Sequence, residues 1–521
     1  MSLAKGSTGR GVDFTALSYN ILAKSLGSNC IPWVMALRDS SLGKEVEAAT
    51  GQRWEAWKDS TLSPPYKAHF HKNYASGDYH LMREFWAAPR LQSAEDIPST
   101  LSGLRYAGED AVSYSAESTE VTCYTLRGVI LRALPDHRDL ALRLVADLLA
   151  AEETIFKWAT RGPRIFARIC SAEVDIVALQ EYDCNNALAL YGGSTEARTF
   201  CDAMLDAGYN CAVLKDCGKD DGTAVFWRRE AFEVATATDG KAEYEVLEAS
   251  GVRLDESAVA LPLTCPPPLP PGCPPQHQGS LVILDMLERW HKRHPGKDGE
   301  MAYDTEQTLL AATDRRSVGS VHLRHLATGE TLWVVTAHLM TTSRDKASTN
   351  AFPGEVRAGE LEFIRDKIGT MIGASTKEPP KVLFMGDFNT PVHDDRVWGG
   401  RPEPTLGCAT PPVLNTGWDA ASKTLQWGCD TKSFSLSDAF ASVHKHGAAV
   451  GPHSSPPSGE GVGRCTSYNA DRIEWIDYMW YTDHTMDCCW RSENITPSEA
   501  LPNVTEPSDH LPISAGFQFR T

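Results

Sequence analysis

The segment KVLFMGDFNTPVHDD, from Lys381 to Asp395, constrains the fold more than any other part of the chain. Its apolar run predicts a buried strand, yet the run ends at the carboxylate of Asp387, and the amide Asn389 follows two residues later. Burying a carboxylate without a partner costs several kcal/mol. The strand is therefore expected to end at the mouth of a sheet, where the acid meets water, a metal ion or a substrate.

Polar side chains recur at the ends of other predicted strands. Asn20 follows Ser18-Tyr19 in the strand pattern TALSYNIL, Glu181 follows VDIVALQ, and His338 ends WVVTAH. Asp509 and His510 stand directly before the last strand pattern, LPISAGFQF. Each has an ordinary explanation as a solvated turn residue, a hydrogen-bonded structural histidine or an Asx-turn. Their joint position at strand ends favours a single polar site.

These residue types suit metal-assisted attack on phosphorus. Carboxylates such as Glu181 and Asp387 are ligands that Mg²⁺ prefers. An asparagine supplies a neutral oxygen or a donor, and a histidine can donate to a phosphoryl oxygen as charge develops there. An Asp–His pair fixes the imidazole tautomer and raises its basicity. The sequence contains no GxxxxGK[ST] loop and no HExxH motif, so neither P-loop nor zincin chemistry is expected.

The order of the motifs adds a family resemblance. SYNIL, ALQEYD, DGTAVFWR, VTAHL, GDFNTP, IDYMWY and PSDHLPI, in this order, resemble the endonuclease/exonuclease/phosphatase superfamily, and within it the nocturnin, Angel and deadenylase branch. The resemblance covers about residues 13–519 in islands. It implies an α/β fold, a four-layer α/β/β/α sandwich with the site at one end of two packed sheets.

The resemblance also implies roles for the strand-end residues. Glu181 is expected to be the principal Mg²⁺ ligand, with Mn²⁺ as an alternative ion, and Asn20 to lie beside the same ion. Asp387 is expected to orient and deprotonate the attacking water. Asn389 would hold a phosphate oxygen or a second ion, and His338 would contact the scissile phosphate.

The C-terminal motifs complete this set of expectations. Asp509 and His510 close the site, with His510 stabilising the transition state. Asp477, in IDYMWY, resembles the aspartate before the family's aromatic strand and is expected to support the catalytic residues from behind. Tyr468, in CTSYN, resembles an aromatic position on the substrate side.

The activity implied is Mg²⁺-dependent hydrolysis of a phosphoric ester, as a 3′–5′ exoribonuclease of the deadenylase kind acting on an RNA 3′ end or a nucleotide. Alternatives of the same fold stay open: a nocturnin-like NADPH 2′-phosphatase, an inositol-polyphosphate 5-phosphatase suggested by ADRIEW at 470–475, a sphingomyelinase, or an inactive binding scaffold. The formal net charge of −18 disfavours a long, non-specific nucleic-acid groove.

The domain organisation expected is one catalytic domain, 12–521, interrupted by a helical insertion at about 54–157. A proline-rich loop, 261–279, and a Gly/Ser/Pro-rich mobile loop, 444–464, interrupt it further. No leucine-rich repeat precedes the catalytic motifs, so docking into a large deadenylase complex is not expected. The sequence has no run of about 18 apolar residues and no secretory signal, and its 14 cysteines show no zinc spacing. A cytoplasmic protein without a transmembrane segment is predicted.

Overall fold

The structure is a computed structural model. It describes residues 11–22, 41–57, 104–182, 187–188, 198–215, 222–235, 318–339, 357–390, 418–419, 424–429, 432–440, 465–492 and 501–520, with short gaps inside several of these ranges. The chain divides into two compact units. The first comprises Met1–Leu22, Pro163–Leu501 and Ser508–Thr521, and the second comprises Ala23–Gly162 and Pro502–Pro507.

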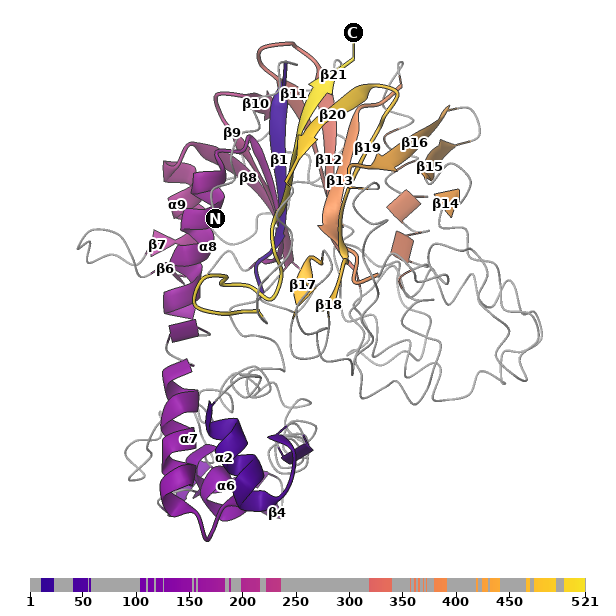
Figure 1. Cartoon of the computed structure of the whole chain (residues 1–521). Helices are drawn as coiled ribbons and strands as arrows, with labels where there is room; N and C mark the ends of the chain where they lie inside the picture. Colours follow the sequence, from indigo (N-terminus) through magenta and orange to yellow (C-terminus); the bar gives the residue numbers. More distant parts are fainter. Residues whose placement is uncertain are drawn as a thin grey trace, which may run out of the picture. The chain divides into compact units, whose positions relative to one another are not determined.

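Two mixed sheets form the first unit (Figure 1). One has the order β20-β21-β1-β5-β9-β8, made of Met486–Arg491, Ile513–Phe519, Phe14–Asn20, Ile176–Tyr182, Gly222–Arg228 and Tyr209–Lys215. The other has the order β10-β11-β12-β13-β19-β16-β15-β14, made of Phe232–Val234, Val318–His325, Thr331–His338, Val382–Asp387, Asp477–Tyr481, Lys432–Asp438, Thr424–Cys429 and Trp418–Asp419. Short ribbons pair β6 (Ala187–Leu188) with β7 (Arg198–Thr199), and β17 (Ser467–Tyr468) with β18 (Ile473–Glu474).

Each sheet contains one parallel pair, and the remaining neighbours pair antiparallel. In the first sheet β1 runs parallel to β5, with Asn20 opposite Gln180. In the second sheet β12 runs parallel to β13, with His338 opposite Asp387, and β19 returns antiparallel so that Asp477 lies opposite Asp387. Parallel strands end at the same edge of a sheet, so the polar strand ends predicted from the sequence lie side by side within each sheet.

The two sheets share one apolar core. Alternate residues of β1 and β5, such as Ala16 and Ala178, join the same buried cluster as Val335 of β12 and Phe384 of β13. This is the period-2 pattern of strands that face another layer.

Helices cover the outer faces of the sheets. α9 (Phe200–Asp206) begins with a capping box at Thr199, and its Phe200 contacts both Tyr182 of β5 and Phe166 of α8 (Trp158–Ala172). Between β12 and β13, the described residues Leu361, Ile364 and Ile372 have helical backbone and lie in the core. The predicted α/β sandwich is therefore confirmed.

The sequence SVGSVHLRHLATGETLWVVTAHL, residues 317–339, predicts a hairpin with its turn at Ala-Thr-Gly-Glu. The structure confirms it: β11 pairs antiparallel with β12, and the turn contains Gly329 with a φ of +75°. Glycine reaches this left-handed region without the steric cost that a Cβ brings.

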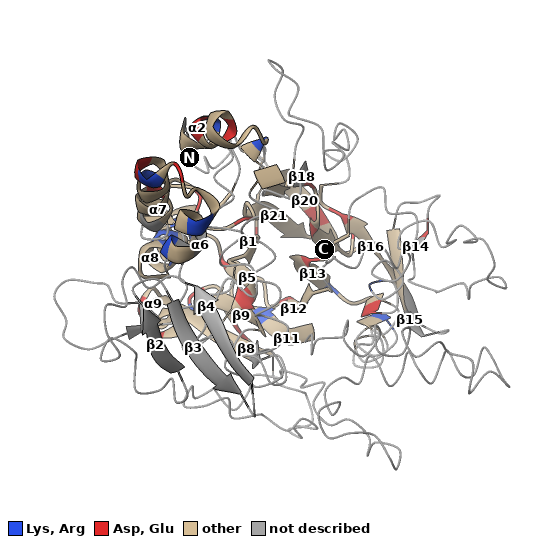
Figure 2. Ribbon diagram, turned by 90° about the horizontal axis from the view of Figure 1, so that it is seen from below, with Lys and Arg blue, Asp and Glu red and all other residues tan. Residues whose placement is uncertain are grey.

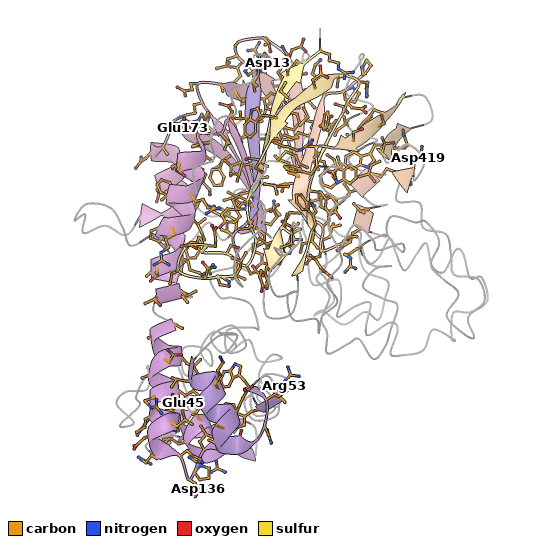
Figure 3. The ribbon with its side chains drawn as sticks, viewed as in Figure 1. Asp13, Glu45, Arg53, Asp136, Glu173 and Asp419 are labelled. Atoms are coloured by element: carbon orange, nitrogen blue, oxygen red, sulfur yellow. The ribbon has the colours of Figure 1, made fainter. Side chains whose placement is uncertain are left out.

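The second unit combines helices with a small sheet. Its helices are α2 (Ser41–Thr50), α6 (Leu126–Ala133) and α7 (Arg138–Ala151), and its antiparallel sheet joins β2 (Leu104–Gly108), β3 (Ala111–Ala116) and β4 (Thr119–Tyr124). Glu45 of α2, labelled in Figure 3, accepts two hydrogen bonds from Arg143 of α7, at 3.0 and 2.6 Å.

Residues 54–157, expected to form a helical insertion, all belong to this second unit. The strands β2 to β4 were not foreseen there, although AVSYSA and TEVTCY carry the alternating β-formers that favour strands. The proline-rich loop at 261–279 and the mobile loop at 444–464 lie outside the described residues. Within the described part of the chain, no helix is both long and apolar enough to span a membrane.

A half-buried histidine in the second sheet, His322, gives a prediction about acid stability. His322 stacks on Trp333 with ring centroids 4.3 Å apart, and burial lowers the pKa of His322 to about 4. The unfolded chain binds this proton near pH 6.5 and the folded chain only near pH 4, so unfolding is favoured as the pH falls between these values. The free energy of unfolding of the wild type therefore falls between pH 7 and pH 4.5. We expect His322→Phe, which keeps the stacking on Trp333, to make this fall smaller by on the order of 2 kcal/mol. Urea unfolding at pH 7 and pH 4.5 measures it; an unchanged pH dependence in the variant would contradict this account.

Candidate active site

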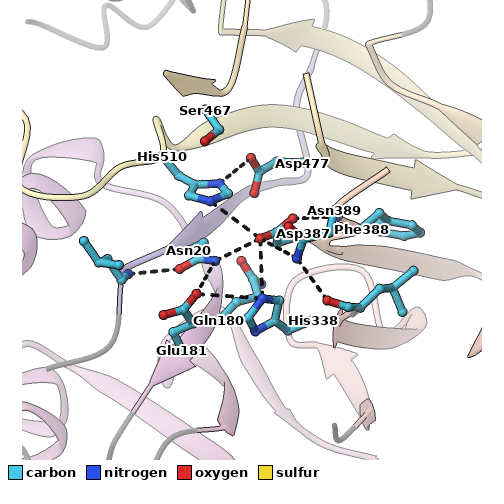
Figure 4. A network of polar contacts seen from close by, with 12 residues as sticks. Asn20, Gln180, Glu181, His338, Asp387, Phe388, Asn389, Ser467, Asp477 and His510 are labelled. Carbon is cyan, nitrogen blue, oxygen red and sulfur yellow. Dashed lines mark hydrogen bonds and ion pairs between the residues drawn. The ribbon is translucent and has the colours of Figure 1, made fainter. Parts of the chain in front are cut away.

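The carboxyl ends of the two parallel pairs bring four polar side chains together (Figure 4). The Asn20 amide donates from Nδ2 to Asp387 Oδ2 at 2.9 Å and to Glu181 Oε1 at 3.2 Å. His338 Nε2 lies 3.5 Å from Asp387 Oδ2 and 3.8 Å from Glu181 Oε1. Asn20 and Glu181 come from one sheet, and His338 and Asp387 from the other, so the site spans the open end of the sandwich.

A local turn fixes the carboxylate of Asp387. The backbone N–H of Asn389 donates to Asp387 Oδ1 at 2.8 Å, and Asn389 Nδ2 donates to Asp387 Oδ2 at 3.2 Å and to the Leu339 carbonyl at 2.9 Å. Asn389 has a φ of +46°, a left-handed conformation that asparagine tolerates better than most residues. The Asx-turn considered as an ordinary explanation is thus present, and it orients the carboxylate within the polar cluster.

Glu181 reaches the site through an irregularity in β5. The register with β9 shifts between Gln180 and Tyr182, and Glu181 has a φ of +55°. In a regular strand, successive side chains point to opposite faces, and Glu181 would then point away from the site, toward the helices. The bulge keeps Glu181 beside Asn20 while Tyr182 still packs on Phe200.

Backbone strain also fixes the orientation of Asn20. The N–H of Leu22, which has a φ of +54°, donates to Asn20 Oδ1 at 2.9 Å. A left-handed leucine costs roughly 1–2 kcal/mol. Because Oδ1 accepts this bond, the NH₂ group of Asn20 points toward the two carboxylates. Left-handed residues at Leu22, Glu181 and Asn389 fit the tendency of strain to gather at functional sites.

His510 closes the site from the C-terminal side. Its Nδ1 lies 2.8 Å from Asp477 Oδ2, and its Nε2 lies 3.6 Å from Asp387 Oδ2 and 3.8 Å from Asp509 Oδ2. Burial disfavours the charged ring, but the carboxylates of Asp477, Asp509 and Asp387 outweigh it and raise the pKa of His510 to about 10. At neutral pH the ring is therefore an imidazolium that donates from Nδ1 to Asp477, while its Nε2–H faces the site.

This arrangement predicts a change in the pH profile of the Asp477→Asn variant. Because Asp477 is the first of the carboxylates that hold the proton on His510, removing its charge lowers the pKa of His510. We expect the alkaline fall in kcat/KM to begin at least one pH unit lower than in the wild type. An Asp477→Asn profile that overlays the wild-type profile would show that His510 is not the charged group.

The charge balance of the site favours a divalent cation. Two histidines accompany four carboxylates, and even with both rings protonated the formal charge is 2 − 4 = −2; the carboxylates are those of Glu181, Asp387, Asp477 and Asp509. Figure 2 shows acidic segments of the ribbon at β5 and β13. Asp477 Oδ1 is also buried and accepts no hydrogen bond from any described residue. Buried negative charge of this kind is ordinarily paired with a cation.

Two parts of the site could hold the ion. One ligand atom from each of Asp387, Asp477 and His510 lies within 4.8 Å of the others. Both nitrogens of His510, however, already face carboxylate oxygens, and Mg²⁺ prefers oxygen ligands. The Glu181 carboxylate suits a hard cation better. Asn20, expected beside the same ion, turns its NH₂ group to the carboxylates of Glu181 and Asp387; an NH₂ group does not bind a cation, so Asn20 orients these carboxylates instead.

The structure places Tyr468 differently from the other expected residues. Its side chain is 5% exposed and belongs to the apolar core. The adjacent Ser467 donates from Oγ to the Asp509 carbonyl at 3.1 Å and forms a backbone bridge with His510. The strand of Tyr468 therefore supports the backbone at Asp509 and His510.

Sequence reasoning did not single out two residues that support the site. Thr466 Oγ1 accepts hydrogen bonds from the N–H groups of Ile476 and Asp477, at 3.0 and 3.1 Å. Gln180, beside Glu181, is fully buried between the sheets. The only signal in the sequence was a polar residue inside an apolar strand pattern, which fits Gln180 but not Thr466.

No family model matches the chain. A curated relative, the CCR4-Not complex 3′–5′-exoribonuclease subunit Ccr4 of Saccharomyces cerevisiae (strain ATCC 204508 / S288c), is 22% identical over 236 residues, covering 41% of this chain and 24% of the relative. The chain thus spans about a quarter of that relative's length.

Solved structures show a weaker likeness. ANGEL2, a 2′,3′-cyclic phosphatase, in complex with adenosine-2′,3′-vanadate, is 17% identical with a TM-score of 0.41, covering 71% of this chain and 92% of that one. The human Nocturnin catalytic domain is 14% identical with a TM-score of 0.37, covering 70% of this chain and 88% of that one. Neither similarity is high enough to indicate a shared substrate. With its two facing sheets, its ordered motifs and its strand-end cluster, the chain resembles the endonuclease/exonuclease/phosphatase superfamily, and within it the nocturnin, Angel and deadenylase branch.

Proposed function

We propose that this protein is a metal-dependent hydrolase of phosphoric esters. The observation that carries the proposal is the meeting of Glu181, Asp387, His338 and His510 at one end of the sandwich, with each contact to Asp387 Oδ2 or Glu181 Oε1 within 3.8 Å. A site made of carboxylates, an amide and two imidazoles can bind a cation, orient water and stabilise charge on phosphorus.

Each residue has a role in an in-line displacement. Glu181 would hold Mg²⁺, which neutralises phosphoryl charge and lowers the pKa of water when bound, and Asn20 orients the Glu181 carboxylate through its Nδ2 hydrogen bond. Asp387 Oδ2, held by Asn20 and Asn389, orients the attacking water and accepts its proton. His338 Nε2–H and the imidazolium of His510 donate to the non-bridging oxygens as negative charge grows there. Asp477 keeps the His510 proton on the side that faces it.

The finer proposal is a 3′–5′ exoribonuclease of the deadenylase kind. Its support is the sequence match to yeast Ccr4, whose name includes this activity. Because the match covers only 24% of Ccr4, the other partners and substrates of that protein are not carried over.

A phosphomonoesterase with a compact substrate is the second candidate. Two observations favour it: the net charge of −18, which repels a long polyanion, and the buried ring of Tyr468, which offers no surface on which a base can stack. A nocturnin-like 2′-phosphatase acting on NADPH and an inositol-polyphosphate 5-phosphatase both fit these observations.

One panel of substrates separates these candidates. The purified full-length protein is incubated with oligo(A), NADPH, inositol polyphosphates and a chromogenic phosphodiester, with Mg²⁺ and with EDTA. Stepwise shortening of oligo(A) from its 3′ end supports the exoribonuclease, and phosphate release from NADPH or an inositol phosphate supports the phosphomonoesterase. Absence of Mg²⁺-dependent hydrolysis across the panel contradicts the proposed function.

A further inference from the structure

We infer that Gln180 is a positioning residue that joins the two sheets directly beneath the site. Its amide Nε2 donates to Thr336 Oγ1 at 3.2 Å and lies 3.5 Å from Ser18 Oγ. Gln180 belongs to β5 of the six-stranded sheet, and Thr336 belongs to β12 of the eight-stranded sheet. The stronger of these two contacts therefore crosses the core. The role presupposes the proposed metal-dependent hydrolysis.

The neighbours of this hydrogen bond are the residues of the site. Glu181 follows Gln180 directly, and Asn20 lies opposite Gln180 in the parallel register of β1 and β5. His338 lies two residues after Thr336 on the same face of β12, and it is opposite Asp387 in the register with β13. The hydrogen bond from Gln180 to Thr336 thus links the sheet that carries Glu181 and Asn20 to the sheet that carries His338 and Asp387.

The contact lies one layer below the groups that would act on a substrate. Gln180 and Thr336 are fully buried. Above them, Asn20 donates to Asp387 at 2.9 Å and His338 lies 3.8 Å from Glu181, and both contacts join the two sheets. A small rotation of one sheet on the other would change these distances first. The hydrogen bond from Gln180 to Thr336 resists that rotation directly below the side chains of the site.

Stability alone does not account for an amide at this position. Gln180 Oε1 is buried and has no hydrogen-bond partner among the described residues, and a buried unsatisfied acceptor costs about 1–3 kcal/mol. Methionine has nearly the same length and no polar atom to satisfy, so it would fill the space at a lower cost. What methionine cannot supply is a directed bond to Thr336. The amide therefore fixes the position of β5 relative to β12.

The experiment compares Gln180→Met and Thr336→Val with the wild-type full-length protein. Mn²⁺ binding is titrated by the loss of its solution EPR signal, kcat and KM are measured with the best substrate of the panel, and stability is measured by urea unfolding. We expect each variant to weaken Mn²⁺ binding and to lower kcat by about tenfold, in the range seen when supporting residues of metal sites are changed. The free energy of unfolding should stay equal or rise.

A double-mutant cycle tests whether the two residues act through one contact. The Gln180→Met/Thr336→Val protein should bind Mn²⁺ no more weakly than either single variant. Thr223→Val is the matched control, because Thr223 is a buried hydroxyl opposite Gln180 on β9 and has no part in the cross-sheet bond. It should leave binding and kcat at wild-type values.

Three results would overturn the inference: wild-type Mn²⁺ binding and kcat in Gln180→Met, losses that add in the double variant, or an equal loss in Thr223→Val. If the wild type hydrolyses no substrate of the panel, the proposed function fails, and the Mn²⁺ titration with the double-mutant cycle alone decides the role of Gln180.

Discussion

Replacing Asp387 by asparagine lowers kcat by about 10²–10⁴-fold, the range of a lost general base, while the fold stays intact. Asparagine keeps the shape of the side chain and an oxygen that can accept the Asn389 N–H bond at 2.8 Å. It removes the charge that orients water and accepts its proton. The free energy of unfolding should not fall, because one of four crowded carboxylates is neutralised. The assay is Mg²⁺-dependent turnover, accompanied by circular dichroism and urea unfolding.

The chain offers a matched control for this variant. Asp438 also ends a strand of the same sheet, and its Oδ1 accepts the backbone N–H of Phe440, two residues later, at 2.9 Å. Asp438→Asn therefore repeats the local change away from the site. It should retain wild-type turnover; equal losses in both variants would mean that the effect of Asp387→Asn comes from the turn.

Glu181→Gln removes the charge of the proposed principal metal ligand, and we expect its largest effect on metal binding. Changes in groups that only support a ligand cost about 10–100-fold in metal affinity, so loss of the ligand's charge should cost more than about 100-fold. The Mg²⁺ concentration for half-maximal activity should rise beyond the range in which the wild type saturates. Calorimetric titration with Mn²⁺ measures the same loss without a substrate.

Glu173 supplies the control for Glu181. It is also a glutamate with left-handed backbone, with a φ of +50°, and it precedes β5, whereas Glu181 lies near the end of that strand. Glu173, labelled in Figure 3, lies between the end of α8 and the start of β5, at the other end of β5 from Glu181. Glu173→Gln should bind Mn²⁺ as the wild type does. A Glu181→Gln protein with undiminished Mn²⁺ affinity would remove Glu181 from the metal site.

Much of the site was predictable because polar residues interrupt apolar strand patterns at their ends. Asn20 and Asp387 are 367 residues apart in the sequence, yet Asn20, His338 and Asp387 each end a strand and Glu181 is the second-last residue of its strand. Strands with apolar centres must pack on each other, and parallel neighbours place their ends at one edge. The pattern alone could therefore bring these side chains to the same end of a sandwich.

The backbone geometry that completes the site could not be predicted from the sequence pattern. A left-handed φ at Glu181 and Leu22 is set by the surrounding packing, because neither residue type favours that conformation locally. The burial of Tyr468 depends on a two-residue strand, too short to show a period. The bond from Gln180 to Thr336 joins positions 156 residues apart, and no local pattern pairs them.

The central claim is that Glu181, Asp387, His338 and His510 surround one divalent cation at the open end of the sandwich. Crystals of the full-length protein soaked with Mn²⁺, with diffraction recorded at a wavelength where Mn²⁺ scatters anomalously, test it directly. The account predicts an anomalous peak in coordination contact with the Glu181 carboxylate, with Asp387 and both histidines around it. A peak only at other residues, or none beside Glu181 at saturating Mn²⁺, would contradict it.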